Sequence, residues 1–221
     1  MTKLSRSVVI FGAIFGALLL SIMSFDALAA TKNLEYTVLR DGNEIGTHAF
    51  VIETKGADTN VTVTTNIQIK KLFITFYKFT HESRETWKNG QLIALSSTTD
   101  DDGIAKAVSV KAENGKITIN AQVQGHDRRQ YAPANAIPAS LWNAETVKQS
   151  MIVNTLDGQM MKVKIERVGT EDVTASGTTV VANHYKLTGE LTRDLWYNSA
   201  GDLVRMSFPD KTDTKIVYSL N

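Results

Sequence analysis

Hydrophobic and polar residues alternate along most of the chain beyond residue 30, with a period of two. In residues 61 to 69 the odd positions are mainly branched and apolar, and the even positions are threonine, asparagine and glutamine. The same alternation recurs in residues 117 to 123 and 161 to 166 and closes the chain at 216 to 220. A strand with one apolar and one polar face is typical of an antiparallel sheet that meets water on one side. The pattern therefore predicts β-structure throughout this part of the chain.

Short turn signals separate the alternating segments. Asn-Gly and Asp-Gly pairs suit the positive φ angles of tight hairpin turns, as at Asp41-Gly42, Asn89-Gly90, Asp102-Gly103 and Asn114-Gly115. Roughly a dozen strands joined in this way form a meander, and a sheet of that many strands must curl or close. We predict an all-β fold: a strongly curved antiparallel sheet or incompletely closed β-barrel, with one short helix or crossover.

The predicted helix or crossover lies between residues 125 and 150, where the period of two is lost. This region contains Pro133 and Pro138. Residues 138 to 149 fit a short helix with Pro138 in its first turn and Trp142 on its apolar side. We interpret the region as a crossover or lid over one end of the sheet.

The first 29 residues resemble a secretory signal peptide. Lys3 and Arg6 precede an apolar stretch, and Ala27-Leu28-Ala29 supplies the small residues that signal peptidase requires. The alternative is an uncleaved membrane anchor, because the apolar run is nearly long enough to span a bilayer. Cleavage near Ala29 leaves residues 30 to 221, which we expect to form a single β-rich domain in the bacterial periplasm or secreted from the cell.

Charge and cysteine content narrow the possible functions. The chain from residue 30 onward has 22 basic and 22 acidic residues, which argues against a general binder of nucleic acid or of anionic membranes. The sequence has no cysteine, so disulfides, thiolate metal sites, a cysteine nucleophile and a lipoprotein anchor are excluded. We expect no cofactor and no integral membrane segment after cleavage.

The strand predicted from Tyr77 to Lys88 carries the main candidate site. Its even positions are all polar and should meet water, whereas its odd positions are aromatic at both ends and should face inward. Residues two apart on a strand lie about 6.6 Å from each other, so one ligand can contact several of them. With one aromatic residue from the expected helix, the candidate ligand-binding residues are Tyr77, Phe79, His81, Ser83, Glu85, Trp87 and Trp142. The alternative is a strand end leaving the core, with these side chains hydrogen-bonded or wet.

Other polar groups in the sequence are weaker candidates. Asp100-Asp101-Asp102-Gly103 lacks the alternate ligands and distal glutamate of a calcium loop and fits a solvated hairpin better. No two histidines have metal-motif spacing, and no Gly-x-Ser-x-Gly or phosphate-binding loop is present. We assign no catalytic residue and no metal ligand.

Several ordered motifs resemble one family of exported bacterial proteins, domain of unknown function family 6134. They are Tyr36-x-x-x-Arg40-Asp41-Gly42, Ile45-Gly46, His81-Glu82, Glu85-x-Trp87, Thr99-Asp100-Asp101-Asp102-Gly103 and Pro138-x-x-x-Trp142-Asn143. The resemblance implies no activity, so no catalytic residue is carried over. More loosely, the pattern is similar to the lipoprotein-carrier (LolA-like) open β-barrel, although carriers cover the sheet with several helices and this sequence predicts one.

Three functional hypotheses follow from the sequence. The first is a non-enzymatic binder or carrier of an apolar or amphipathic small molecule, a lipid-binding candidate in which His81 and Glu85 orient a polar head. The second is an envelope module with a filled core that binds a protein partner. The third is a hydrolase or isomerase that uses His81 with Glu85, which requires the two side chains to meet in an open cleft.

Overall fold

The computed structural model describes residues 29–221, except for the side chain of Lys71. The predicted signal peptide therefore lies outside the described residues, apart from Ala29, and stays a prediction. The first half of the described chain forms eight strands: β1 (Ala30–Arg40), β2 (Asn43–Lys55), β3 (Asp58–Lys71), β4 (Ile74–Lys88), β5 (Gln91–Asp101), β6 (Ile104–Glu113), β7 (Lys116–Val123) and β8 (His126–Pro133). The second half forms a 3₁₀ helix and seven strands: β9 (Ile137–Pro138), η1 (Ala144–Lys148), β10 (Met151–Val153), β11 (Met160–Ala175), β12 (Thr178–Gly189), β13 (Arg193–Asn198), β14 (Leu203–Pro209) and β15 (Lys215–Leu220).

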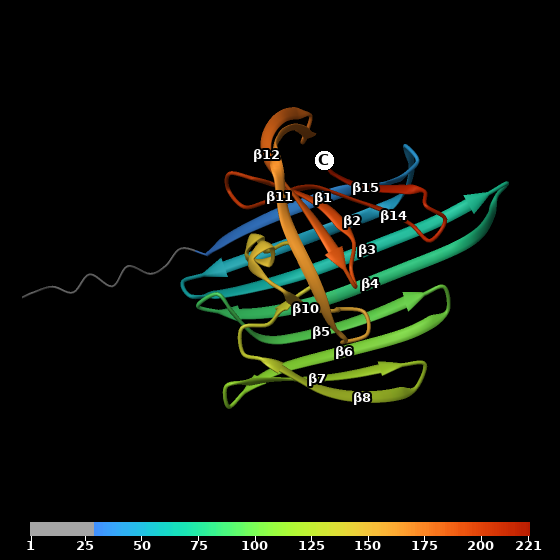
Figure 1. Cartoon of the computed structure of the whole chain (residues 1–221). Coiled ribbons are helices and arrows are strands. Elements are labelled where there is room, and N and C mark those ends of the chain that lie inside the picture. The colour runs from blue at the N-terminus through green and yellow to red at the C-terminus, as the bar shows by residue number, and fades with distance from the viewer. Residues whose placement is uncertain (1–28) are drawn as a thin grey trace, which may run out of the picture.

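All fifteen strands belong to one sheet, in the order β8-β7-β6-β5-β4-β3-β2-β1-β15-β14-β13-β12-β11-β10-β9. Two meanders thus meet where β1 pairs with the last strand, β15. Neighbours are antiparallel except β9 and β10, which are parallel. Figure 1 shows β1 to β8 as one broad curved layer, with the orange and red strands of the C-terminal half crossing in front of it. The predicted all-β, curved and incompletely closed sheet is confirmed.

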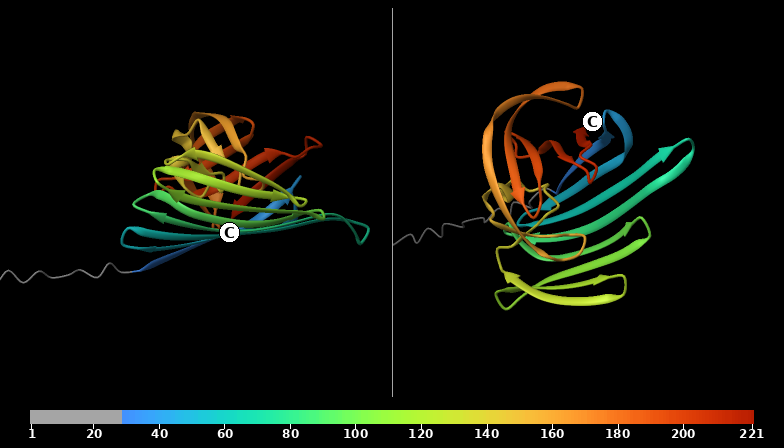
Figure 2. Two further views of the ribbon diagram at one scale, coloured as in Figure 1. Left: turned by 90° about the horizontal axis from the view of Figure 1, so that it is seen from below. Right: turned by 45° about the vertical axis from the view of Figure 1, so that its right-hand side comes forward.

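The sheet curls far enough for its two ends to touch without closing the ladder. Gln130 on edge strand β8 donates a hydrogen bond to the carbonyl oxygen of Gly158, which precedes β11. A Cβ atom built on Gly158 would lie 2.9 Å from Ile119 on β7, so the β10–β11 loop packs directly on the inner face of β7. Figure 2 shows the curl from two further directions. The C-terminal meander therefore covers the concave side of the N-terminal one.

The region from 125 to 150 differs from its predicted form in two respects. Residues 126 to 133 form a strand, β8, which lies at the sheet edge and is mostly exposed, so the in–out alternation that marks other strands is absent. The expected helix is a 3₁₀ turn limited to η1 and capped by the Asn143 side chain, while Pro138 belongs to β9. The interpretation as a crossover over the sheet still holds. Within residues 29–221 no helix has the length and apolar character needed to cross a bilayer.

Gly46 on β2 is a position where the strands approach too closely for a side chain. A Cβ atom there would collide with the backbone oxygen of Asn66 on β3. We expect Gly46→Ala to lower the free energy of unfolding by about 2–3 kcal/mol, because β3 must move away. Urea denaturation of this variant and of Gly169→Ala measures the effect. Gly169 on β11 has open space around its Cβ position, so equal losses in the two variants would refute the steric explanation.

Candidate functional site

Strand β4 carries the predicted site residues on the inner face of the sheet, as the alternation indicated. Ser83 and Glu85 are each 1% exposed and His81 is 7% exposed. Tyr77 and Phe79, nearer the β3–β4 turn, are only partly buried. The strand thus runs from a sealed end at Glu85 and Trp87 to a more open end at Tyr77. The inward placement is confirmed, whereas ligand binding stays a prediction.

Glu85 forms the link between β4 and the crossover segment. Its Oε2 atom accepts hydrogen bonds from the indole nitrogens of Trp87 and Trp142, each at 2.8 Å. The two indole rings meet edge to face, with centroids 5.5 Å apart. Next to Trp142, Leu141 has a φ of 66°, a left-handed conformation that is strained for leucine, and its carbonyl oxygen accepts a hydrogen bond from Tyr197. Trp142 therefore closes over Glu85 from a segment that is itself held under strain.

The surroundings of Glu85 favour its neutral form. Burial raises the pKa of the Glu85 carboxyl, and the hydrogen bonds from the Trp142 and Trp87 indoles, together with the nearby Ser140, oppose that rise only in part. Oε1 has no hydrogen-bond partner of good geometry. If Oε1 carries the proton, it presents a donor to the interior with nothing to receive it.

A row of buried polar residues crosses four strands beside this group. His48 Nδ1 lies 2.7 Å from Thr65 Oγ1, and His81 Nδ1 lies 2.8 Å from Thr99 Oγ1. The strand register places His48, Thr65, His81 and Thr99 side by side on β2, β3, β4 and β5. Burial, and then the neighbouring His81, lower the pKa of His48 to about 3, and burial lowers the pKa of His81 to about 4. Both imidazoles are therefore neutral near pH 7.

Three buried polar atoms of this inner face lack any hydrogen-bond partner: His48 Nε2, Ser83 Oγ and Glu85 Oε1. Buried polar groups are almost always paired, because an unpaired one costs roughly 1–3 kcal/mol. We define His48, Thr65, His81, Ser83, Glu85 and Thr99 as the inner polar row. The row is the part of the core that retains unused hydrogen-bonding capacity.

Tyr77, Asp101 and Lys106 form a polar cluster at the open end of the row. Tyr77 donates a hydrogen bond of 2.8 Å to Asp101, and Lys106 forms an ion pair of 2.7 Å with the same carboxylate. Burial alone would raise the pKa of Asp101, but the contacts from Lys106 and Tyr77 hold it below its usual range. The cluster is internally paired, which suits a structural role at the rim.

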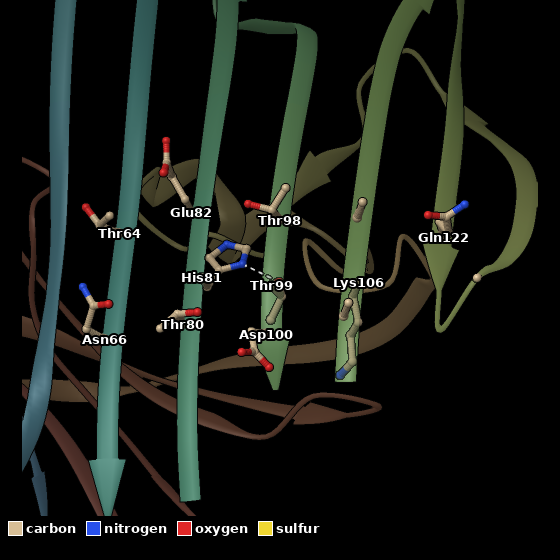
Figure 3. A pocket seen from close by; sticks show the side chains of 13 residues that line it. Thr64, Asn66, Thr80, His81, Glu82, Thr98, Thr99, Asp100, Lys106 and Gln122 are labelled. Carbon is tan, nitrogen blue, oxygen red and sulfur yellow. Dashed lines mark hydrogen bonds between the residues drawn. The ribbon is translucent and has the colours of Figure 1, made fainter. Parts of the chain in front are cut away.

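A hollow of about 480 Å³ lies over strands β3 to β7, and Figure 3 shows its lining. Most of that lining comes from the face opposite the row: Thr64, Asn66, Thr80, Glu82, Thr98 and Asp100. The register pairs these residues with one another across the strands, so they share the outer face. His81 reaches instead toward Thr99, as the dashed line in Figure 3 marks. The hollow is therefore mainly an outer, hydroxyl-rich surface, although His81 and Thr99 of the inner polar row also contribute to its lining.

Two inner-face residues were not predicted from the sequence. His48 is outside the predicted set, although its alternation with Phe50 on β2 indicates an inward side chain. Arg193 on β13 packs its guanidinium 3.7 Å above the Phe208 ring and has no acidic partner among the ion pairs of the described residues. Burial lowers the pKa of Arg193 to about 10, so it still carries its charge at pH 7. Only the order of the strands brings this partly buried side chain near Tyr218.

The arrangement of His81 and Glu85 gives little support to the hydrolase or isomerase hypothesis, which requires the two side chains to meet. His81 is hydrogen-bonded to Thr99 and Glu85 to two tryptophans, and no hydrogen bond joins His81 with Glu85 in the described structure. Within residues 29–221 no group of three histidine, aspartate or glutamate side chains has the geometry of a metal site.

The fold and this inner face define a β-barrel-like domain with an open, curled sheet. The chain belongs to the family described as domain of unknown function (DUF6134), whose sequence profile matches residues 36–221. Among solved structures it is similar to a β-barrel-like protein of the domain of unknown function DUF1849 from Brucella abortus, with a TM-score of 0.53 and 8% identity over 86% of this chain and 95% of that one. At this identity the likeness shows the fold alone. No curated protein matches the chain.

Proposed function

We propose that the protein is an exported, non-enzymatic binder of an amphipathic small molecule. The oxygen-bearing head of that molecule would reach the inner polar row, and its apolar part would lie against the partly buried aromatic residues Tyr77 and Phe79. The observation that carries the proposal is the set of three unpaired buried polar atoms, His48 Nε2, Ser83 Oγ and Glu85 Oε1.

The chemistry of these atoms indicates the kind of head group. If the Thr65 hydroxyl donates to His48 Nδ1, the proton of this neutral ring lies on Nε2, which then becomes a donor. A protonated Glu85 and the Ser83 hydroxyl are donors as well, and Arg193 adds a positive charge on the C-terminal side. A head group rich in acceptor oxygens, such as an ester or a carboxylate, would satisfy all of them.

Access to the row requires the crossover to move. Trp142 closes over Glu85 through one hydrogen bond and one ring contact, and the strained backbone at Leu141 favours release. Residues 139 to 150 would therefore act as a lid, with the Trp142–Glu85 hydrogen bond as its latch.

Native mass spectrometry of the protein purified from bacterial cells tests the proposal. We expect a stoichiometric small-molecule adduct that organic solvent releases, and a chain mass that corresponds to cleavage near Ala29. Ser83→Val should reduce the adduct at least about tenfold, because it removes a buried donor and fills the space beside Glu85.

Ser96→Val is the matched control, since Ser96 lies on the exposed face of the neighbouring strand β5. It should keep the adduct. A wild-type protein without adduct and without extractable ligand would contradict the proposal, as would equal loss in the two variants.

A further inference from the structure

The turn between β3 and β4 differs from the other tight turns of the described chain. Six two-residue turns with positive φ at both positions have glycine second, at Gly42, Gly90, Gly103, Gly115, Gly125 and Gly177. The β3–β4 turn has the same conformation but consists of Leu72 and Phe73, with φ angles of 49° and 68°. Bulky residues are disfavoured in this conformation, so the turn itself gives no reason for their presence.

The side chains at and beside this turn are apolar and largely exposed. Leu72 is 82% exposed, Phe73 is completely exposed, and Ile74 and Phe76 are each at least 60% exposed. Large apolar residues scattered singly on a surface are ordinary, but four of them at one tip indicate a contact surface. We define residues 70 to 78 as the apolar tip.

The apolar tip projects beyond the sheet. The last residue of β3 that pairs with β2 is Ile67, and the last residue of β4 that pairs with β5 is Phe79. Apart from a contact of Lys78 with the Asp102 turn, the residues between them form ladder pairs only with each other. The hairpin therefore extends about 13 Å past its last pair with β2, at about 3.4 Å per residue. Figure 1 shows this hairpin as the long arm that reaches past the ends of the adjacent strands.

The charged residues of the β3–β4 hairpin around the apolar tip are all lysines. Residues 59 to 81 contain three lysines and no acidic residue, although the chain as a whole is almost neutral. Lys70 and Lys78 flank the tip and are exposed, where long lysine side chains can reach phosphate groups. Acidic residues lie beside the base of the tip: Asp102 contacts the backbone at Lys78, and Glu44 lines a surface hollow together with Lys70.

From these observations we propose that the apolar tip inserts shallowly into a lipid bilayer, with Leu72, Phe73 and Phe76 among the acyl chains and Lys70 and Lys78 at the anionic headgroups. A narrow two-stranded tip with apolar groups on both sides and lysines behind fits the layered bilayer interface. The acidic residues at its base limit the depth of insertion. This role does not depend on the inner polar row.

Co-sedimentation with vesicles of phosphatidylethanolamine and phosphatidylglycerol tests the insertion, on protein purified from cells as they process it. We expect wild-type protein to bind and the double variant Phe73→Ser/Phe76→Ser to bind at least about tenfold more weakly. Val168→Ser/Val181→Ser is the matched control, because these valines are exposed on β11 and β12 and should leave binding unchanged. All variants share one N-terminus, so a difference in vesicle binding between them measures the contribution of the apolar tip.

The variant Phe73→Trp separates insertion from adsorption. The native Trp87 and Trp196 are buried and Trp142 is partly buried, so the new tryptophan should dominate any change on binding. Its fluorescence should shift to the blue and be quenched by lipids brominated on the acyl chains. Three results would each overturn the proposal. They are no binding of wild-type protein to vesicles, equal binding of the Phe73→Ser/Phe76→Ser variant, and Phe73→Trp fluorescence that brominated lipids do not quench. None of these results bears on the small-molecule adduct.

Discussion

Acidification from pH 6.5 to pH 4 is expected to remove about 6 kcal/mol from the free energy of unfolding, through His48 and His81 alone. Their folded pKa values of about 3 and about 4 lie below the ordinary value of 6.5. Between these pH values the two histidines become protonated in the unfolded chain but stay largely neutral in the folded protein. The stabilisation is complete above pH 6.5 and is lost as the pH falls toward 4. Since domains are stable by only about 5–15 kcal/mol, the protein should unfold in mild acid.

Urea denaturation at intervals between pH 7 and 4.5 measures this loss. The double variant His48→Gln/His81→Gln should lose most of the slope, which is about 2.7 kcal/mol per pH unit for two such groups. His126→Gln, an exposed change on β8, should keep it. Asp101, whose pKa is lowered, responds mainly at lower pH. Glu85, whose pKa is raised, contributes a slope of opposite sign in this range, but this slope is the same in wild type and in the histidine variants. A slope that survives in the double variant would show that the two histidines are not held neutral by the fold.

The sheet could be predicted because its signals are local. Alternation decides which side chains of a strand point inward, and the pairs from Asp41-Gly42 to Ser176-Gly177 decide where strands turn. Strand β8 was missed because an exposed edge strand buries almost nothing and so has no alternation. The pairing of β1 with β15 leaves no local signal, because it joins residues at opposite ends of the chain.

The candidate site could be predicted only as a face of one strand. The alternation of inward and outward side chains along the strand predicted that His81, Ser83 and Glu85 face inward, and this placement is confirmed. The pairing of His48 with Thr65 and of Glu85 with Trp142 depends on the strand register and on the path of the crossover, which the spacing of residues within β4 does not specify.

The apolar tip could not be predicted from alternation. Its run of apolar residues breaks the alternating pattern, while the backbone still forms a regular hairpin.

Replacement of Glu85 by alanine is expected to lower the free energy of unfolding by about 3–5 kcal/mol. The change leaves the indole nitrogens of Trp87 and Trp142 without their common acceptor, and it opens a cavity in a fully buried position. Urea denaturation at pH 7 measures the loss. Glu82→Ala is the matched control, because Glu82 lies on the outer face of β4 and its one ion pair among the described residues is with the exposed Arg84. It should change stability by less than about 1 kcal/mol.

Replacement of Glu85 by glutamine should have a different and pH-dependent effect. The amide oxygen still accepts both indole hydrogens, and an amide cannot ionise. Because the pKa of Glu85 is raised on folding, wild-type protein loses stability as the pH rises from about 4.5 through the folded pKa. Glu85→Gln should therefore match wild type at pH 5 and exceed it at pH 8. A difference between the two proteins that stays constant from pH 5 to pH 8 would mean that Glu85 does not change its protonation on folding, and that Oε1 does not offer the proton on which binding of an acceptor head group relies.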